Sequence, residues 1–347
     1  MKIGIATVQI PFIRGGAEIL AESLCAELIK RKIQATIISI PFKWYPPEHI
    51  LDNMLISRLI DVTEVNGQNI DLLITLKFPA YYFIHPNKIA WLLHQHRQAY
   101  DLYGTPHGDL HQTEQGQRVA NEIQRWDKVL LPEHRHLYTI SKKVTDRLLA
   151  YTHLHSTPLY PPPNNPECFQ CHDYEPFILA PGRLDALKRQ HLIIESMPMI
   201  PKDIRLVLIG NADSEYGTQV NHMINHLGLK DRVLIRGQVS EDEKIDLYSR
   251  CLCVYNGVYD EDYGYLTIEG FLSSKPVLTH TDSGGPLEFV IHGRNGFITE
   301  PDPSQIADCV TQLYSKHGLA KDMGNTARND ILSMNMTWDD IIGKLLS

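Results

Sequence analysis

The chain begins MKIGIATVQIPFIRGGAEILAESLCAELIKRKIQATIISIP, residues 1–41. The apolar runs Ile3–Val8 and Ala35–Ile40 are typical of buried strands, and the longer segment between them, Ala17–Arg31, is typical of a helix. A helix that joins two neighbouring strands returns the chain to the same end of the sheet, so the strands run parallel. This opening therefore predicts a βαβ unit.

The same alternation continues along the chain with one interruption. Residues 157–166 contain five prolines, which exclude both a helix interior and a central strand. Strand-like runs precede this segment at Leu72–Thr75, Ile89–Leu93, Val129–Leu131 and Leu137–Ile140, and follow it at Phe177–Ala180, Arg205–Ile209, Arg232–Ile235, Leu252–Tyr255 and Pro276–Thr279. We expect two α/β domains, residues 1–160 and 161–335, that face each other across a cleft and bind ligands beyond the carboxyl ends of their strands.

The composition is that of a globular protein with two cores. The chain has 347 residues, of which 43% are hydrophobic and 21% charged, and its net charge is -8. A negative chain is not attracted as a whole to nucleic acid or to an anionic bilayer. No apolar run approaches the length of a membrane span, the first residues are typical of a strand rather than a signal peptide, and six scattered cysteines fit a reducing compartment, so we expect a cytoplasmic protein.

Two glutamates mark the most informative motif. Glu261 lies in a loop after the apolar run that ends at Tyr255, and Glu269 lies in a segment that can form a helix. Backbone amides at the start of that helix, those of Gly264, Tyr265 and Leu266, have no acceptor within it and can bind an anion. Two carboxylates beside such amides suit a nucleotide sugar, because its hydroxyls can bind the carboxylates and its pyrophosphate needs donors.

A basic loop follows the first strand of the second domain. Arg183 and Lys188 bracket this short loop and can converge on one anion, and each charge-assisted hydrogen bond contributes about 1.5–3 kcal/mol. The pair would bind a diphosphate. For this spacing alone, a solvated basic turn is an equally good interpretation.

The first domain offers two weaker candidates. Gly15 and Gly16 stand between the first strand and the first helix, where glycine lets a phosphate or sugar approach the backbone. The complete dinucleotide motif and its ribose-binding acid are missing, which argues against a nicotinamide site. His94 follows a buried strand at the edge that faces the predicted cleft; it can bind a sugar hydroxyl, but a structural histidine is the commoner reading, and His96 is the alternative.

Two further patterns spell metal or haem sites, and we reject both. Cys168, Cys171 and His172 have the spacing of a haem attachment site, but they lie beside the proline-rich segment and no axial ligand is indicated. Asp260 and Asp262 resemble a cation-binding Asp-x-Asp motif. Because Arg183 and Lys188 can supply positive charge to a diphosphate, we expect no metal and no other cofactor.

Taken together, these motifs resemble the retaining glycosyltransferases of the GT-B fold, and within them glycosyltransferase family 4. The resemblance covers nearly the whole chain and is strongest from Phe177 to Thr299. Six motifs appear in the family's order: residues 182–185, Lys188, residues 208–210, residues 237–240, the glutamate pair, and residues 283–288.

The resemblance implies a role for each matching residue. Arg183 and Lys188 would hold the donor pyrophosphate, Glu269 the ribose and Glu261 the donor sugar, with the amides of Gly264, Tyr265 and Leu266 completing the phosphate site. Arg236 and Val239 would lie along the base, Gly15 and Gly16 would approach from the acceptor-side domain, and His94 would be the cleft histidine. The last helix, within residues 336–347, would pack back on the first domain.

The resemblance also implies an activity and its partners. The chain would move a sugar, with retention of anomeric configuration, from a nucleotide diphosphate sugar, UDP- or GDP-linked, to a hydroxyl of a glycan or lipid-linked acceptor. Such an acceptor allows peripheral contact with the inner membrane face, which the net charge does not favour. The alternatives are a nucleotide-sugar 2-epimerase and a non-catalytic protein that binds sugar nucleotides; retention of all four charged residues argues against the latter.

Overall fold

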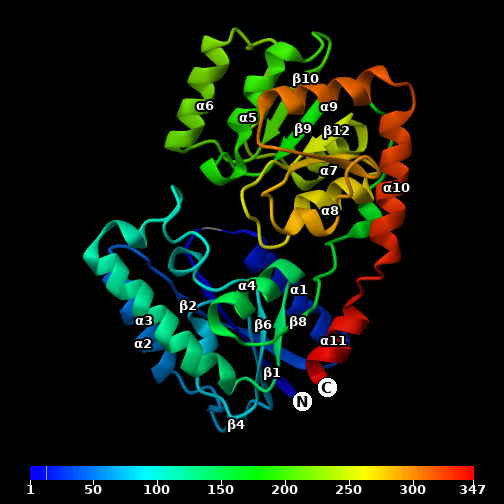
Figure 1. Cartoon of the computed structure of the whole chain (residues 1–347). Coiled ribbons are helices and arrows are strands. Elements are labelled where there is room, and N and C mark those ends of the chain that lie inside the picture. The colour runs from blue at the N-terminus through cyan, green and yellow to red at the C-terminus, as the bar shows by residue number, and fades with distance from the viewer. Residues whose placement is uncertain (13) are drawn as a thin grey trace. The chain divides into compact units, whose positions relative to one another are not determined.

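A computed structural model describes residues 1–12 and 14–347, which form two compact units (Figure 1). The first unit contains Met1–Pro162 and Met336–Ser347, and the second contains Pro163–Asn335. The chain passes between them within the proline-rich segment, where the backbone can join neither a helix nor a central strand. Each unit is built around its own parallel sheet, as the repeated strand–helix alternation predicts.

The first unit has a sheet in the order β2-β1-β5-β6-β7-β8. Its strands are β1 (Lys2–Gln9), β2 (Gln34–Pro41), β5 (Leu72–Thr75), β6 (Lys88–Leu92), β7 (Leu137–Thr139) and β8 (Thr157–Pro158), and each neighbouring pair is parallel. Its helices include α1 (Gly16–Lys30), α2 (Glu48–Leu59), α3 (Glu114–Leu130) and α4 (Lys142–Thr152), and a small hairpin joins β3 (Glu64–Val65) to β4 (Gln68–Asn69). Pro158 lies in β8 at the edge of the sheet, where a missing amide costs no ladder bond.

One predicted strand of this unit is wrong. Residues 129–131 lie at the end of α3 and the start of a short 3₁₀ turn, and Val129 is 65% exposed. The buried positions of α3 include Val119, Ile123 and Leu130, which recur at helical spacing on one face. Three adjacent apolar residues cannot distinguish a strand from the last turn of such a helix.

The C-terminal helix α11 (Trp338–Leu346) belongs to the first unit. The Trp338 ring lies edge-on to that of Trp91, with 6.2 Å between centroids. The carboxylate of Asp339 accepts a 3.0 Å hydrogen bond from Nε of Arg31, and the Tyr138 hydroxyl donates to the carbonyl of Lys344 over 3.1 Å. The first unit is therefore assembled from both ends of the chain.

The second unit has a parallel sheet in the order β11-β10-β9-β12-β13-β14. Its strands are β9 (Phe177–Pro181), β10 (Arg205–Ile209), β11 (Val233–Ile235), β12 (Cys253–Tyr255), β13 (Val277–His280) and β14 (Gly296–Thr299). Its helices include α5 (Gln190–Ser196), α6 (Glu215–His226), α7 (Glu241–Arg250), α8 (Tyr265–Leu272), α9 (Pro303–Ser315) and α10 (Leu319–Ser333). The strand order reverses direction between β9 and β12, and open parallel sheets bind ligands beside such a switch point.

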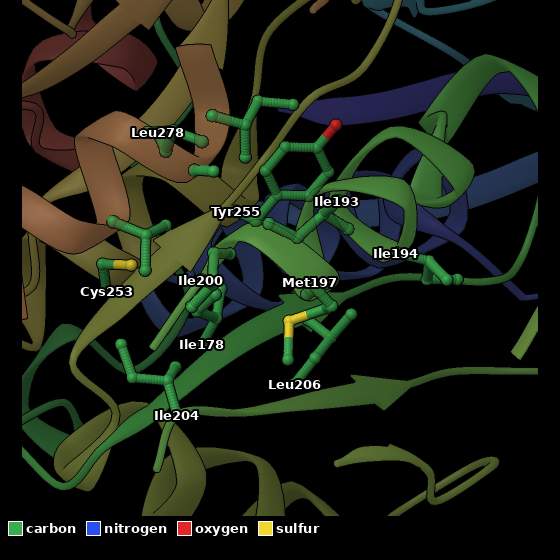
Figure 2. Packing of buried hydrophobic residues seen from close by; sticks show 14 of the residues in the cluster. Ile178, Ile193, Ile194, Met197, Ile200, Ile204, Leu206, Cys253, Tyr255 and Leu278 are labelled. Carbon is green, nitrogen blue, oxygen red and sulfur yellow. The ribbon is translucent and has the colours of Figure 1, made fainter. Parts of the chain in front are cut away.

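A buried apolar cluster fixes these strands in place. Figure 2 shows Ile178 of β9 and Leu206 of β10 beside Ile193 of α5 and Met197 just after it, and all four are at most 2% exposed. Burial of each such side chain contributes about 1.5–3 kcal/mol. The carboxyl ends of β9 and β12 are thus held on a rigid base, and the loops that follow them start from fixed points.

None of the helices in residues 1–12 and 14–347 combines the length and the apolar character that a membrane crossing requires.

Candidate active site

The loops after β9 and β12 meet at the point where the strand order reverses. The amide of Tyr259 donates to the carbonyl of Leu187 over 2.7 Å. Beside this bond the ammonium of Lys188 contacts both carboxylate oxygens of Glu261, at 2.8 and 2.6 Å. These side chains are 20% and 27% exposed, so the ion pair is largely but not wholly shielded from water. Two motifs far apart in the sequence therefore contribute to one charged centre.

The loop after β13 supports the backbone of Glu261. The amides of Asp260 and Glu261 donate to the carbonyls of Asp282 and Ser283, each over 2.9 Å, and the amide of Gly285 donates to the carbonyl of Glu261 over 2.7 Å. Gly284 has φ +73°, and a β-carbon there would lie 2.6 Å from the carbonyl oxygen of Glu261. Only glycine fits this close approach of two backbones.

Helix α8 starts directly after this loop. Gly264 caps it with φ +105°, and a β-carbon at Gly264 would lie 3.1 Å from the Pro286 ring. The first amides of the helix, including those of Tyr265 and Leu266, have no carbonyl acceptor within it. A β-carbon on Gly182 would lie 3.5 Å from the Leu266 side chain and 4.0 Å from Cε of Lys188. The amino end of α8 is thus next to the loop that carries Lys188. Free backbone amides and an ammonium group lie close together there, and both can bind an anion.

Glu269 lies one helical turn further along α8. Its Oε1 accepts a hydrogen bond of 2.9 Å from Nζ of Lys244, and its Oε2 is buried with no hydrogen-bond partner among the described residues. Burial alone would lower the pKa of Lys244, but the charges of Glu269 and Glu241 raise it above the usual value. The ammonium of Lys244 therefore fixes the orientation of the Glu269 carboxylate.

Arg183 is placed differently from Lys188. Its side chain is 68% exposed, and its Nε lies 3.6 Å from a carboxylate oxygen of Asp185. The structure thus brings Lys188 to Glu261 and leaves Arg183 extended at the rim of the same loop. From this exposed position the guanidinium can reach an anion that enters from solvent.

The residues expected along the base lie near the ends of β10 and β11. The Arg236 amide donates to the carbonyl of Leu208 over 2.9 Å, and its side chain pairs with Glu243 at 2.6 Å while staying 52% exposed. Val239 is partly buried just before α7. A β-carbon on Gly210, at φ +131°, would lie 2.3 Å from the Gly182 carbonyl, so the ends of β9 and β10 lie against each other with no side chain between them.

The first unit places its own candidates at the carboxyl ends of β1 and β6. Gly15 caps α1 and Gly16 begins it, but the Gly15 amide already donates to the side chain of Glu18 over 2.8 Å. His94 follows β6, with Nδ1 2.5 Å from the carbonyl oxygen of Gln95. His96 packs on Phe78 with 5.0 Å between rings, its Nε2 is buried without a partner among the described residues, and burial lowers its pKa to about 3. A neutral imidazole at this strand end can bind a hydroxyl but carries no charge.

Sequence reasoning missed two charged residues beside the site. Arg189 directly follows Lys188, yet its side chain is buried and pairs with Asp282 at 2.6 Å. Spacing along the chain could not separate a buried cation from an exposed one in the run Lys188–Arg189.

The rejected metal and haem patterns form no metal site among the described residues. Those residues contain no group of three or more His, Cys, Asp or Glu side chains placed as metal ligands. The ring of His172 lies 3.2 Å from the hydroxyl of Ser249.

Part of the second unit is similar to a known protein family. Residues 169–330 match the family model of glycosyl transferases group 1. The alpha-1,3/1,6-mannosyltransferase ALG2 of Mus musculus is 29% identical over 127 residues, which are 35% of this chain and 30% of that protein. This chain therefore matches less than a third of that relative's own length.

Solved structures resemble the chain over its full length. Sucrose-phosphate synthase from Thermosynechococcus elongatus superimposes with a TM-score of 0.79 at 17% identity, covering 99% of this chain and 98% of that one. The Anabaena protein HepE, crystallised with UDP and glucose, gives a TM-score of 0.69 at 16% identity, covering 99% and 100%.

Two parallel-sheet α/β units of this kind define the GT-B fold, and the predicted fold class is confirmed. The second unit of this GT-B fold carries a segment, residues 169–330, that is similar to glycosyl transferases group 1.

Proposed function

We propose that the protein is a retaining glycosyltransferase that moves a sugar from a UDP- or GDP-linked donor to a hydroxyl of a glycan or lipid-linked acceptor. The contact between Lys188 and Glu261 beside the amino end of α8 carries this proposal. It combines a cation and backbone donors for a diphosphate with a carboxylate for sugar hydroxyls. The group 1 domain and the UDP complex of HepE support a nucleotide-linked donor.

The chemistry follows from where charge develops. The bond between the anomeric carbon and the diphosphate oxygen breaks, a bond to the acceptor oxygen forms, and the acceptor's proton passes to the departing diphosphate oxygen. Negative charge grows on the leaving diphosphate, so groups that bind this state more strongly than the intact donor lower the barrier. We assign this task to Lys188 and the first amides of α8, and Arg183 can join them from the rim.

The carboxylates take the donor's hydroxyls. Glu261 would bind the transferred sugar next to Lys188, and Glu269 would bind the ribose one helical turn away. Positive charge from Lys188 and Arg183 lets the diphosphate bind and leave without a metal ion.

Thermal unfolding with a panel of nucleotides tests the proposal. UDP, GDP and their sugars are each added to the protein, and a true donor at a hundred times its dissociation constant should stabilise it by about 2.7 kcal/mol. Transfer is then followed with a radiolabelled donor, and NMR of the products separates transfer from epimerisation of the donor. If no nucleotide raises the unfolding temperature, the proposal is wrong.

A further inference from the structure

We infer that Arg189 is a positioning residue, which keeps Lys188 and Glu261 in contact by joining the loops after β9, β12 and β13. The inference rests on the proposed function, because it concerns the geometry of the same site. Arg189 itself touches neither the donor nor the reacting atoms in this scheme.

The contacts of the guanidinium define this role. Its Nε donates to the carbonyl of Gly257 over 2.7 Å, and Nη2 donates to the carbonyl of Val258 over 2.8 Å, both in the loop after β12. Its Nη1 and Nη2 also bind the two carboxylate oxygens of Asp282 at 2.8 and 2.6 Å, in the loop after β13. One side chain therefore ties its own loop to two others through four hydrogen bonds.

These contacts continue directly to the catalytic pair. Lys188 is the residue before Arg189, so the backbone that carries the ammonium is anchored next to it. The backbone of Asp282 and Ser283 accepts the amides of Asp260 and Glu261, as described above. A shift of Asp282 would therefore move the backbone of Glu261, while a shift of Arg189 would move that of Lys188.

The backbone of Arg189 supports a specific role for its side chain. Arg189 has φ +50° and ψ +39°, a left-handed conformation that disfavours residues with a β-carbon and suits glycine. Its residue is only 8% exposed, and the same side chain also lies over the Tyr259 ring. A disfavoured backbone occupied by a buried arginine indicates that the guanidinium contacts, rather than local preference, hold this turn in place.

The alternative is that Arg189 binds the donor phosphate itself. Its planar fork is already filled by Asp282 and two carbonyl oxygens, so a phosphate would have to displace buried partners. Lys188 and Arg183 are nearer to solvent and have fewer fixed contacts. The two roles predict different kinetics, which makes them separable.

The test substitutes Arg189→Gly, because glycine accepts the left-handed backbone and removes only the guanidinium. We expect kcat/KM for transfer to fall about 10²-fold, as misplaced reacting groups typically cause. Affinity for UDP should fall by a much smaller factor, because Glu269 and the first amides of α8 do not depend on Arg189 and UDP lacks the sugar that Glu261 would bind. Arg189→Lys should recover part of the rate, since one ammonium can replace some of the four hydrogen bonds.

Arg232→Ala is the matched control. Arg232 is a partly buried arginine of the same unit, and it binds the carbonyls of Met197, Ile200, Pro201 and Ile204 rather than any site loop. Its loss should lower the unfolding temperature without lowering kcat. If Arg189→Gly behaves like this control, or if it loses UDP affinity by the same factor as kcat/KM, the positioning role is wrong.

Asp282→Asn supplies an independent measurement, including the case in which Arg189→Gly does not fold. It keeps the shape of the carboxylate and should also lower kcat/KM, and the double substitution should be no worse than Arg189→Gly alone, because the two side chains act as one unit. Additive losses would contradict the inference. Failure of the unaltered protein to bind UDP or GDP would instead contradict the proposed function.

Discussion

At the residue scale, Lys188 forms an ion pair with Glu261, and a bound donor would compete for both side chains. Its ammonium binds both oxygens of Glu261, and its side chain is 20% exposed. A bound diphosphate would take part of the ammonium's hydrogen bonding away from Glu261. Hydroxyls of the donor sugar would then donate to the Glu261 carboxylate in its place. Under the proposed function, one ion pair would therefore couple binding of the diphosphate to recognition of the sugar.

Replacement of Lys188 by alanine tests its part in transfer. We expect turnover to fall about 10² to 10³-fold, because a preorganised donor to the leaving group is lost. The fold should persist, since the ion pair is partly exposed and contributes modestly to stability. Turnover with a radiolabelled donor is the measurement, and the exposed Lys230→Ala serves as control. Equal turnover of the two variants would remove Lys188 from catalysis.

Glu269→Gln tests the proposed ribose contact. Glutamine keeps the size of the side chain but weakens charge-assisted hydrogen bonds, each of which contributes about 1.5–3 kcal/mol. Calorimetry should therefore show weaker binding of UDP or GDP, with little change in the rate of the bound donor. An unaltered dissociation constant would place the ribose elsewhere.

The sequence identified some residues of the candidate site but not all of them. Lys188 and Glu261 were both singled out from the sequence, and the structure brings them into contact. Arg183, chosen by the same spacing argument, is extended and exposed. Arg189 was not singled out, because its burial depends on a left-handed backbone and on Asp282, which is distant in sequence. Tertiary contacts, which no spacing encodes, decide which of three neighbouring cations faces the site.

At the element scale, the switch between β9 and β12 explains why the motifs gather. Parallel strands send every following loop to the same edge, and the order of the sheet changes direction between these two strands, whose loops are in contact. The sequence was sufficient to predict that edge, since apolar runs end where polar motifs begin. It was insufficient for residues 129–131, because a short apolar run fits both a strand and an amphipathic helix end.

Gly264→Ala tests how closely α8 must approach its neighbours. Alanine at φ +105° is strained, and its methyl group would press on Pro286, so the amino end of the helix must shift. We expect a loss of about 1–3 kcal/mol in unfolding free energy together with weaker nucleotide binding. Gly228→Ala is the control: it has φ +65° but open space around it, so only the backbone cost of about 1 kcal/mol should appear. Loss of stability with full nucleotide affinity in Gly264→Ala would separate α8 from the anion site.

At the scale of the whole molecule, buried neutral histidines tie stability to pH. Burial lowers the pKa of His280 to about 4, with a further decrease from the charge of Arg189, and burial lowers that of His134 to about 3. In the unfolded chain the histidine pKa is near 6.5. Between pH 6.5 and the lowered pKa values, the unfolded chain therefore binds more protons than the folded protein. The contribution of these neutral histidines to the free energy of unfolding should be fully present above about pH 6.5 and should be lost as the pH decreases to about 4.

Substitution of His280 by glutamine measures this effect. The shift at His280 alone corresponds to roughly 3 kcal/mol lost between pH 6.5 and 4. Denaturant unfolding at several pH values should show a shallower pH dependence for His280→Gln, and no change for the exposed His222→Gln. Parallel pH profiles for both variants and the unaltered protein would contradict the assigned protonation state.

The two units also differ in how the chain builds them. The second is one continuous segment, residues 163–335, with its own core, whereas the first needs both ends of the chain. Helix α11 buries Ile341, Ile342 and Leu345, so its removal exposes apolar surface of the first unit. A chain that ends at Asn335 should therefore show a lower calorimetric unfolding temperature for one transition, assigned to the first unit by proteolysis. The second transition and the affinity for UDP should be unchanged, because Lys188, Glu261 and Glu269 all belong to the continuous unit. Loss of nucleotide binding on this truncation would mean that the second unit does not form the donor site by itself.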